Sequence, residues 1–211
     1  MVMPQEVNRA AFGGDLQQVH AWLQEGPVDA LDKTGTGLLH AAAGGGQLCV
    51  AEELLQRGAS VDLRGPAGAT ALTLAAVQGQ HAMVRLLLEH RASVDLKCKI
   101  GKTALMFAAA QGHKECVQEL LQAGASTELR DRNGIGALQA AEAKGHAAIT
   151  RLLRQHAAKL GPTSSKAVIT AEARAAAEAA ADRAATELLA EEGAKEAANA
   201  GAGKKKKKNG G

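Results

Sequence analysis

The sequence predicts an all-α solenoid of stacked helix-turn-helix units with β-turn tips, followed by a C-terminal Ala-rich helical extension. Two observations predict this fold. Similar stretches begin at Gly35, Gly68, Gly101 and Gly134, at a constant interval of 33 residues, and such a period is typical of stacked repeats. Apolar residues make up 46% of the 211 residues but aromatic residues only 1%, so Leu, Val and Ala must fill the core, which suits thin, closely packed helices.

Each unit contains two short segments with helical periodicity, and the third unit shows both. Its first segment carries small apolar residues at helical spacing: Leu105, Ala108, Ala109 and Gly112. Its second segment carries a larger apolar face: Cys116, Val117, Leu120 and Leu121. Both patterns predict helices, with Gly124 as a left-handed C-cap and Asn133-Gly134 as a turn pair. One unit cannot bury its own stripe, so the units must stack.

The units resemble the ankyrin repeat, because "GKTALMFAAAQGH" at Gly101 and its three counterparts follow that family's pattern of Gly-x-Thr-Pro-Leu-His-x-Ala-Ala and then Gly-His. The resemblance implies four repeats, at 32–64, 65–97, 98–130 and 131–160. Residues 1–31 resemble an N-terminal capping unit, in which Val19, Trp22 and Leu23 take core positions of the second helix. Within the quoted stretch, Thr103 is expected to bond the backbone at the helix start, while Met106 and Phe107 fill space between units.

The departures from the family pattern carry information of their own. The family's proline is absent from every unit: Leu38, Ala71, Ala104 and Ala137 stand in its place. Two extra glycines in Gly44-Gly45-Gly46 are expected to weaken the first helix by about 1–2 kcal/mol if they are helical. Arg91 stands where Gly58 and Gly124 stand in other units, which predicts backbone strain. Charged residues at 142 and 154 replace apolar ones and mark unit four as the C-terminal cap.

The sequence argues against catalysis and metal binding, so we nominate no catalytic, cofactor-binding or metal-ligating residue. No nucleophile, base and orienting acid can be named together. His40, His113 and His146 fall at the family's structural positions, and no second pair completes a zinc site with His113 and Cys116. Three scattered cysteines fit a reducing compartment better than a disulfide framework. Cys98, between two lysines, would be the most reactive if exposed.

A binding surface remains, and the resemblance implies that turn tips and the exposed side of the first helices line a concave groove. The matching positions are Lys33, Thr36, Ala69, Val77, Gln78, Lys99, Ile100, Lys102, Gln111, Arg132, Asn133, Ile135 and Lys144. The tips hold basic and apolar residues and no acid, which favours a partner protein with an acidic segment and apolar anchors. A solvated rim with incidental lysines is the alternative. We expect a monomer without a small-molecule substrate.

The C-terminal part of the chain changes composition. Residues 161–200 form a linker and an Ala-rich charged segment that predicts a solvated helix, and 201–211 form a basic end that we expect to be disordered. Lys204, Lys205, Lys206, Lys207 and Lys208 resemble a nuclear-import signal, or solubilise the chain. No apolar run could span a membrane and no secretory signal is evident. We therefore expect a scaffold or adaptor protein in the cytoplasm or the nucleus. The alternatives are an adaptor of a ubiquitin ligase and a factor associated with nucleic acid, although binding of nucleic acid is disfavoured.

Overall fold

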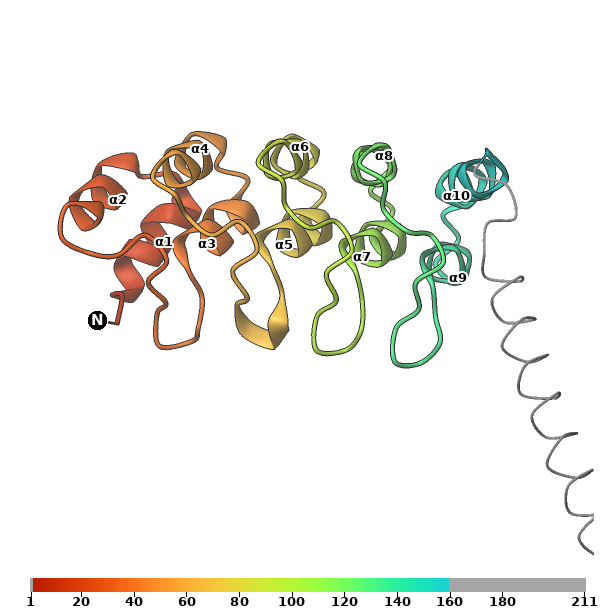
Figure 1. The fold of residues 1–211 in the computed structure, drawn as a ribbon, viewed down its shortest axis with the longest axis horizontal. Helices are drawn as coiled ribbons and strands as arrows, with labels where there is room; N and C mark the ends of the chain where they lie inside the picture. The colour runs from red at the N-terminus through yellow and green to blue at the C-terminus, as the bar shows by residue number, and fades with distance from the viewer. Residues whose placement is uncertain (1, 160–211) are drawn as a thin grey trace, which may run out of the picture. The chain divides into compact units, whose positions relative to one another are not determined.

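The computed structural model describes residues 2–159, and within this range the chain is all-helical apart from one isolated bridge between Leu31 and Gly37. The α-helices of these described residues follow one another in five pairs (Figure 1). They are α1 (Gln5–Gly13), α2 (Leu16–Leu23), α3 (Leu38–Gly45), α4 (Leu48–Gln56), α5 (Ala71–Gln78), α6 (His81–Glu89), α7 (Ala104–Gln111), α8 (Lys114–Gln122), α9 (Ala137–Ala143) and α10 (Ala147–Lys159). A 3₁₀ turn, η1 (Pro66–Gly68), lies in the loop before α5.

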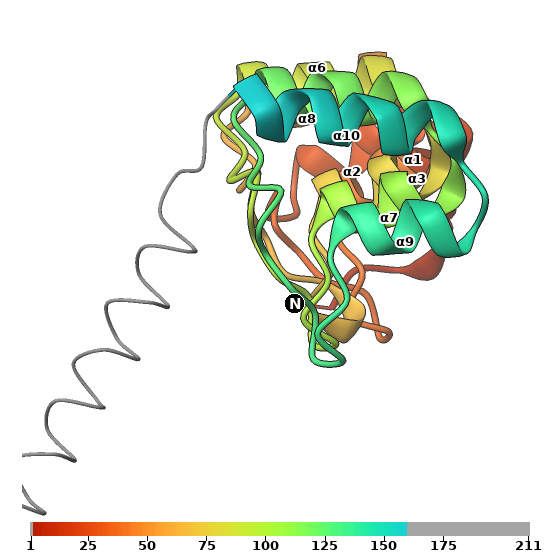
Figure 2. The same cartoon turned by 90° about the vertical axis from the view of Figure 1, so that its right-hand side faces the viewer.

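The five pairs stack side by side and form two layers. The first helices α1, α3, α5, α7 and α9 pack on one another in this order, and the second helices form a parallel row above them. Loops connect each second helix to the next first helix and project away from both layers (Figure 2). The predicted solenoid of helix-turn-helix units is therefore confirmed for the residues that the structure describes. None of the helices within residues 2–159 is both long and apolar enough to cross a bilayer.

The first helices begin in one of two related ways. In units two and three, Thr70 and Thr103 accept a hydrogen bond from the backbone N–H three residues later, as predicted for Thr103. In units one and four, glycine takes the cap position, and the side chain of the third helical residue accepts from the glycine N–H instead: His40 Nδ1 from Gly37, and Gln139 Oε1 from Gly136. Both arrangements satisfy a donor that the helix itself leaves free.

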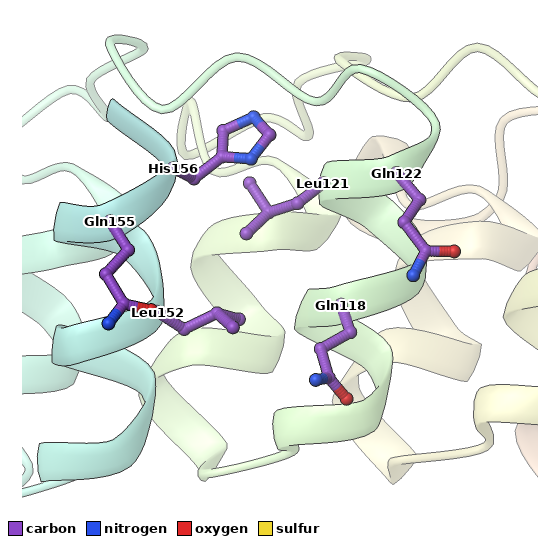
Figure 3. Close-up of a pocket in the computed structure, with 6 residues that line it drawn as sticks. All are labelled: Gln118, Leu121, Gln122, Leu152, Gln155 and His156. Atoms are coloured by element: carbon purple, nitrogen blue, oxygen red, sulfur yellow. The ribbon is translucent and has the colours of Figure 1, made fainter. Parts of the chain in front are cut away.

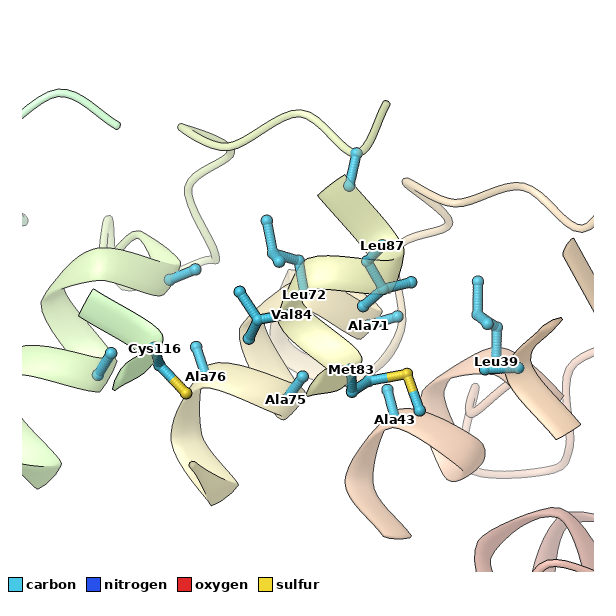
Figure 4. Packing of buried hydrophobic residues seen from close by; sticks show 14 of the residues in the cluster. Leu39, Ala43, Ala71, Leu72, Ala75, Ala76, Met83, Val84, Leu87 and Cys116 are labelled. Carbon is cyan, nitrogen blue, oxygen red and sulfur yellow. The ribbon is translucent and has the colours of Figure 1, made fainter. Parts of the chain in front are cut away.

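The core is one hydrophobic cluster that runs through all the described units. Leu54, Leu87, Leu120 and Leu153 occupy the same position in successive repeats, and all four are buried in this cluster. Between units, Met83, Val84 and Leu87 of α6 pack against small and apolar side chains of α3 and α5 (Figure 4). The alanines predicted to keep the first helices thin are buried as well. The stack is stabilised because each unit covers its neighbour's apolar face.

Residues at the N-terminal end explain the run of three glycines. Gly44 and Gly45 belong to α3, and α1 packs against this part of the helix. A Cβ at Gly45 would collide with the carbonyl oxygen of Phe12, so only glycine lets α1 come this close. The glycines that are predicted to weaken α3 are therefore linked to the close packing of α1 on this helix. Of the residues predicted to be core in α2, Val19 is fully buried, whereas Trp22 and Leu23 are only partly buried.

Two further sequence predictions can be compared with the structure. Arg91 has φ 62°, in the left-handed region where Gly58 and Gly124 have 83° and 84°, so the predicted strain is present. In unit four, Arg154 donates to Glu142 at 2.6 Å and both side chains are exposed, in keeping with a polar end of the stack. The predicted Ala-rich helix (161–200), the lysine end (201–211) and the proposed import signal lie outside the described residues.

Candidate partner-binding surface

The loop tips of neighbouring units are linked to one another through their backbones. Lys99 N donates to Ala67 O at 2.8 Å, and Arg132 N donates to Ile100 O at 3.3 Å. These bonds join the tips of units two, three and four into one continuous ribbon of backbone. Side chains on these tips are therefore held at a constant spacing along the stack, which is the condition for recognising an extended partner.

The residues nominated from the sequence differ in accessibility. Nine of the thirteen are exposed: Lys33, Gln78, Lys99, Ile100, Gln111, Arg132, Asn133, Ile135 and Lys144. The other four are half-buried: Thr36, Ala69, Val77 and Lys102. Ile100 and Ile135 are 52% and 42% exposed, which is unusual for large aliphatic side chains. A binding role for these thirteen residues stays a prediction.

The half-buried nominees also help to hold the frame. The carbonyl oxygens of Ala69 and Val77 accept hydrogen bonds from Nε2 of His40 and His113, at 3.2 and 2.9 Å. Each bond crosses from one unit to the next. The Lys102 ammonium lies 5.7 Å from the centre of the Phe107 ring, a cation–π contact that orients the lysine. The half-buried Phe107 therefore supports a surface residue, and its predicted role in filling space between units stays a prediction.

Two aspartates order the first and the fourth tip, so the expectation that the tips hold no acid is wrong for these two. Asp32 Oδ1 accepts from the backbone N–H groups of Thr34 and Thr36, and Asp131 Oδ1 accepts in the same way from Asn133 and Ile135. Burial alone would raise the pKa of the Asp32 carboxyl, but hydrogen bonds from Thr34, Thr36 and Asn8 lower the pKa to about 2. Both carboxylates are thus engaged in hydrogen bonds within their own turns, and neither aspartate extends toward a partner.

The structure adds three cations that the sequence reasoning missed. Arg64, Lys97 and Arg130 stand 33 residues apart, immediately before the tips of units two, three and four, and all are exposed. Arg64 donates to Lys97 O at 3.0 Å and Lys97 donates to Arg130 O at 2.9 Å. The constant 33-residue spacing of these three cations was the sequence signal that could have identified them. Together with three of the nominated cations, Lys99, Lys102 and Arg132, they form the basic strip, which we define as Arg64, Lys97, Lys99, Lys102, Arg130 and Arg132.

The cations of the basic strip are not neutralised by neighbouring acids. Within residues 2–159, none of the six makes an ion pair with an Asp or Glu side chain, whereas three Arg–Glu ion pairs form elsewhere in that range. The ion pair of Arg85 with Glu119, at 2.6 Å, joins the second helices α6 and α8. The positive charge of the basic strip is therefore not compensated by carboxylates, although Arg64, Lys97 and Arg130 donate to carbonyl and amide oxygens. Ion pairs compensate charge at several points on the second helices.

A second feature missed from the sequence is a hollow at the N-terminal end of the first-helix layer. We call it the N-terminal hollow; it has a volume of about 420 Å³ and is formed by α1, α3, α5 and the first tip. Phe12 lines it and is 55% exposed. Thr36 and Gln78, nominated from the sequence, line it as well. When Gly14 of the capping unit is aligned with Gly46 and Gly79, Phe12 takes the position of the nominated Val77. This alignment was the sequence signal that could have identified Phe12.

The outer layer contains a smaller groove between α8 and α10, with a volume of about 210 Å³. Figure 3 shows Leu121 and Leu152 between the two helices, with glutamine side chains at the edges. His156 lies at one end of the groove. Its walls are mostly neutral amides and leucines, so it offers shape but little charge.

Comparison with known families agrees with this architecture. A family model described as ankyrin repeats (three copies) matches residues 7–98 and 92–164, which is about three quarters of the chain. The chain belongs to the ankyrin-repeat family. A search of curated proteins finds no match to the sequence. Ankyrin repeats generally mediate protein–protein interactions and are typically non-catalytic interaction modules.

The histidines at ankyrin-pattern positions have structural hydrogen bonds. His40 lies between units one and two, where Nε2 donates to Ala69 O, and burial lowers the pKa of its imidazole. His146 Nε2 donates to Ala110 O at 3.1 Å, and His113 bonds as described above. Within residues 2–159, no three His, Cys, Asp or Glu side chains are arranged to hold a metal ion.

The cysteines differ in their accessibility. Cys116 is buried in the ankyrin core, and its pKa is raised to about 11, first by burial and then by Glu115 and Glu119. Its thiol is therefore protonated at neutral pH. Cys98 is only half-exposed, and Cys49 on α4 is the exposed cysteine of the described residues.

Proposed function

We propose that this ankyrin-repeat chain is a non-catalytic scaffold or adaptor that binds a partner protein along its loop tips and first helices. The observation that carries this proposal is the basic strip. Six cations lie on or immediately before three adjacent tips that are tied together through their backbones, and none of them is paired with an acid within residues 2–159. Unpaired charge of one sign along an ordered surface favours a partner of opposite charge.

The partner that suits this surface is an acidic segment with apolar anchors. The carboxylates of such a segment would replace water around Lys99 and Arg132, while Ile100 and Ile135 would lose exposed apolar surface on binding. Charge sets the rate of encounter and the choice of partner, and the apolar contacts supply affinity. Asp131 stands between Arg130 and Arg132 of the strip in the chain, but its Oδ1 already accepts hydrogen bonds from two backbone N–H groups.

The proposal can be tested by proximity labelling in cells with matched charge reversals. Lys99→Glu combined with Arg132→Glu reverses two cations of the basic strip. Lys114→Glu combined with Arg151→Glu changes the net charge equally, at exposed positions on α8 and α10. We expect the first variant to lose labelled partners and the second to retain them.

Two outcomes would contradict the proposal. Identical labelling by both double variants and the wild type would show that the basic strip is a solvated rim. Loss of the labelled proteins on nuclease treatment would show that the acidic partner is a nucleic acid instead of a protein.

A further inference from the structure

Phe12 is exposed for a structural reason. Its backbone is held against α3, because only the glycine at position 45 leaves room for the Phe12 carbonyl oxygen. The ring itself lies beside Gly44, where an added Cβ would meet Cε2 at 3.6 Å. In the other units Val77, Ala110 and Ala143 stand at the position of Gly44. Position 44 therefore has no side chain of its own to cover the ring.

The surroundings of the ring form a place for one more apolar side chain. Ala41 and Leu74 line the N-terminal hollow together with Phe12 and the polar Gln78. Its volume of about 420 Å³ exceeds that of a single large side chain. Aromatic rings that are exposed in a hollow are typical anchor sites, because burying them on binding releases water from apolar surface.

The charge at the hollow also favours an acidic partner. Arg9, one of its lining residues, is exposed and makes no ion pair within residues 2–159. Asp32 also lines the hollow, but its oxygens already accept from Asn8, Thr34 and Thr36. Arg9 is thus a free cation beside apolar surface, whereas the nearby acid is engaged in its turn.

We propose that the N-terminal hollow binds an aromatic or large aliphatic side chain at one end of the acidic segment that the basic strip binds. This inference rests on the proposed function. Packed helices lie about 8–10 Å apart, so α3 and α9 are separated by roughly 30 Å. An extended chain covers this distance in about nine residues at 3.3 Å each. The partner's anchor and its acidic residues therefore belong to one short segment.

The test uses fluorescein-labelled twelve-residue peptides and fluorescence anisotropy with the full chain. Each peptide has six acidic residues, spaced by Ser and Gly, and carries either Trp or Ser at one end. This terminal residue is placed at the N-terminus in one pair of peptides and at the C-terminus in another. The Trp peptide that binds more tightly is compared with the Ser peptide of the same pair. The wild type is expected to bind the Trp peptide about tenfold more tightly, the gain from partial burial of one large side chain. Phe12→Ala is expected to remove most of this preference.

Two variants separate this inference from the proposed function. Leu48→Ala changes another exposed apolar residue, on α4 away from the hollow, and should retain the Trp preference. The double reversal at Lys99 and Arg132 should weaken both peptides and leave their ratio unchanged. A Trp preference that survives Phe12→Ala would overturn the hollow as an anchor site, even if charge reversal still weakens binding. Failure of the wild type to bind either peptide would overturn the proposed function itself.

Discussion

Leu87→Ala tests whether the repeats share one hydrophobic core. Leu87 is fully buried in α6 and packs near Met83, Val84 and Leu72 (Figure 4). Removing three carbons costs about 2 kcal/mol in transfer free energy. A cavity between units held by their neighbours on both sides collapses poorly, so the total loss in unfolding free energy should be about 3–5 kcal/mol. For a folded unit of this size, the melting temperature should drop by roughly 10 °C.

The assay is thermal and urea unfolding followed by far-ultraviolet circular dichroism. Leu88→Ala is the matched control, because Leu88 is the next residue and is only partly buried. It should cost about 1 kcal/mol, since less apolar surface is lost. Equal losses for the two variants, or an unchanged melting temperature for Leu87→Ala, would refute the shared core.

Three further substitutions follow from the structure. Arg91→Gly should stabilise the fold by ~0.5–1 kcal/mol, because φ is 62° there and glycine adopts this region without strain; a lower urea midpoint would contradict this. Burial holds the pKa of His40 below 6.5, so the unfolded state binds more protons and stability falls as pH drops below about 6.5. His40→Gln, which copies Gln139, should flatten that decline in unfolding curves between pH 7 and 5, and an equally steep decline would count against it. Gly45→Ala should loosen α1 and raise its hydrogen exchange, whereas Gly44→Ala should not; equal exchange would show that α1 is not held by this contact.

The repeat period made most of the fold predictable. Apolar residues recur at the same positions of each 33-residue unit, so Leu54, Leu87, Leu120 and Leu153 could be assigned to one interior before the structure was known. The capping unit was less predictable because it departs from the pattern. Its α1 depends on a contact between Phe12 and Gly45, and no local sequence signal reveals a contact between residues so far apart in the chain.

The candidate surface was predictable in part, for a different reason. The family pattern places the tips, so exposed residues such as Lys99 and Arg132 could be named from the sequence. Arg64 and Lys97 were missed because they precede the tips; their 33-residue spacing was visible in the sequence, and their hydrogen bonds to the next unit show that they lie along the same ribbon. The N-terminal hollow needs side chains from three helices of different units, which is a property of the stack.

The most direct test of partner binding at the tips is site-specific crosslinking. A photo-reactive amino acid replaces Ile100, which is 52% exposed on the tip of unit three, or Leu48, which is on α4 of the outer layer. After illumination in cells, the crosslinked peptides are sequenced by mass spectrometry. We expect crosslinks from position 100 to a short acidic segment of a partner protein, and few from position 48. Crosslinks to acidic segments from position 48 with none from position 100 would contradict this expectation.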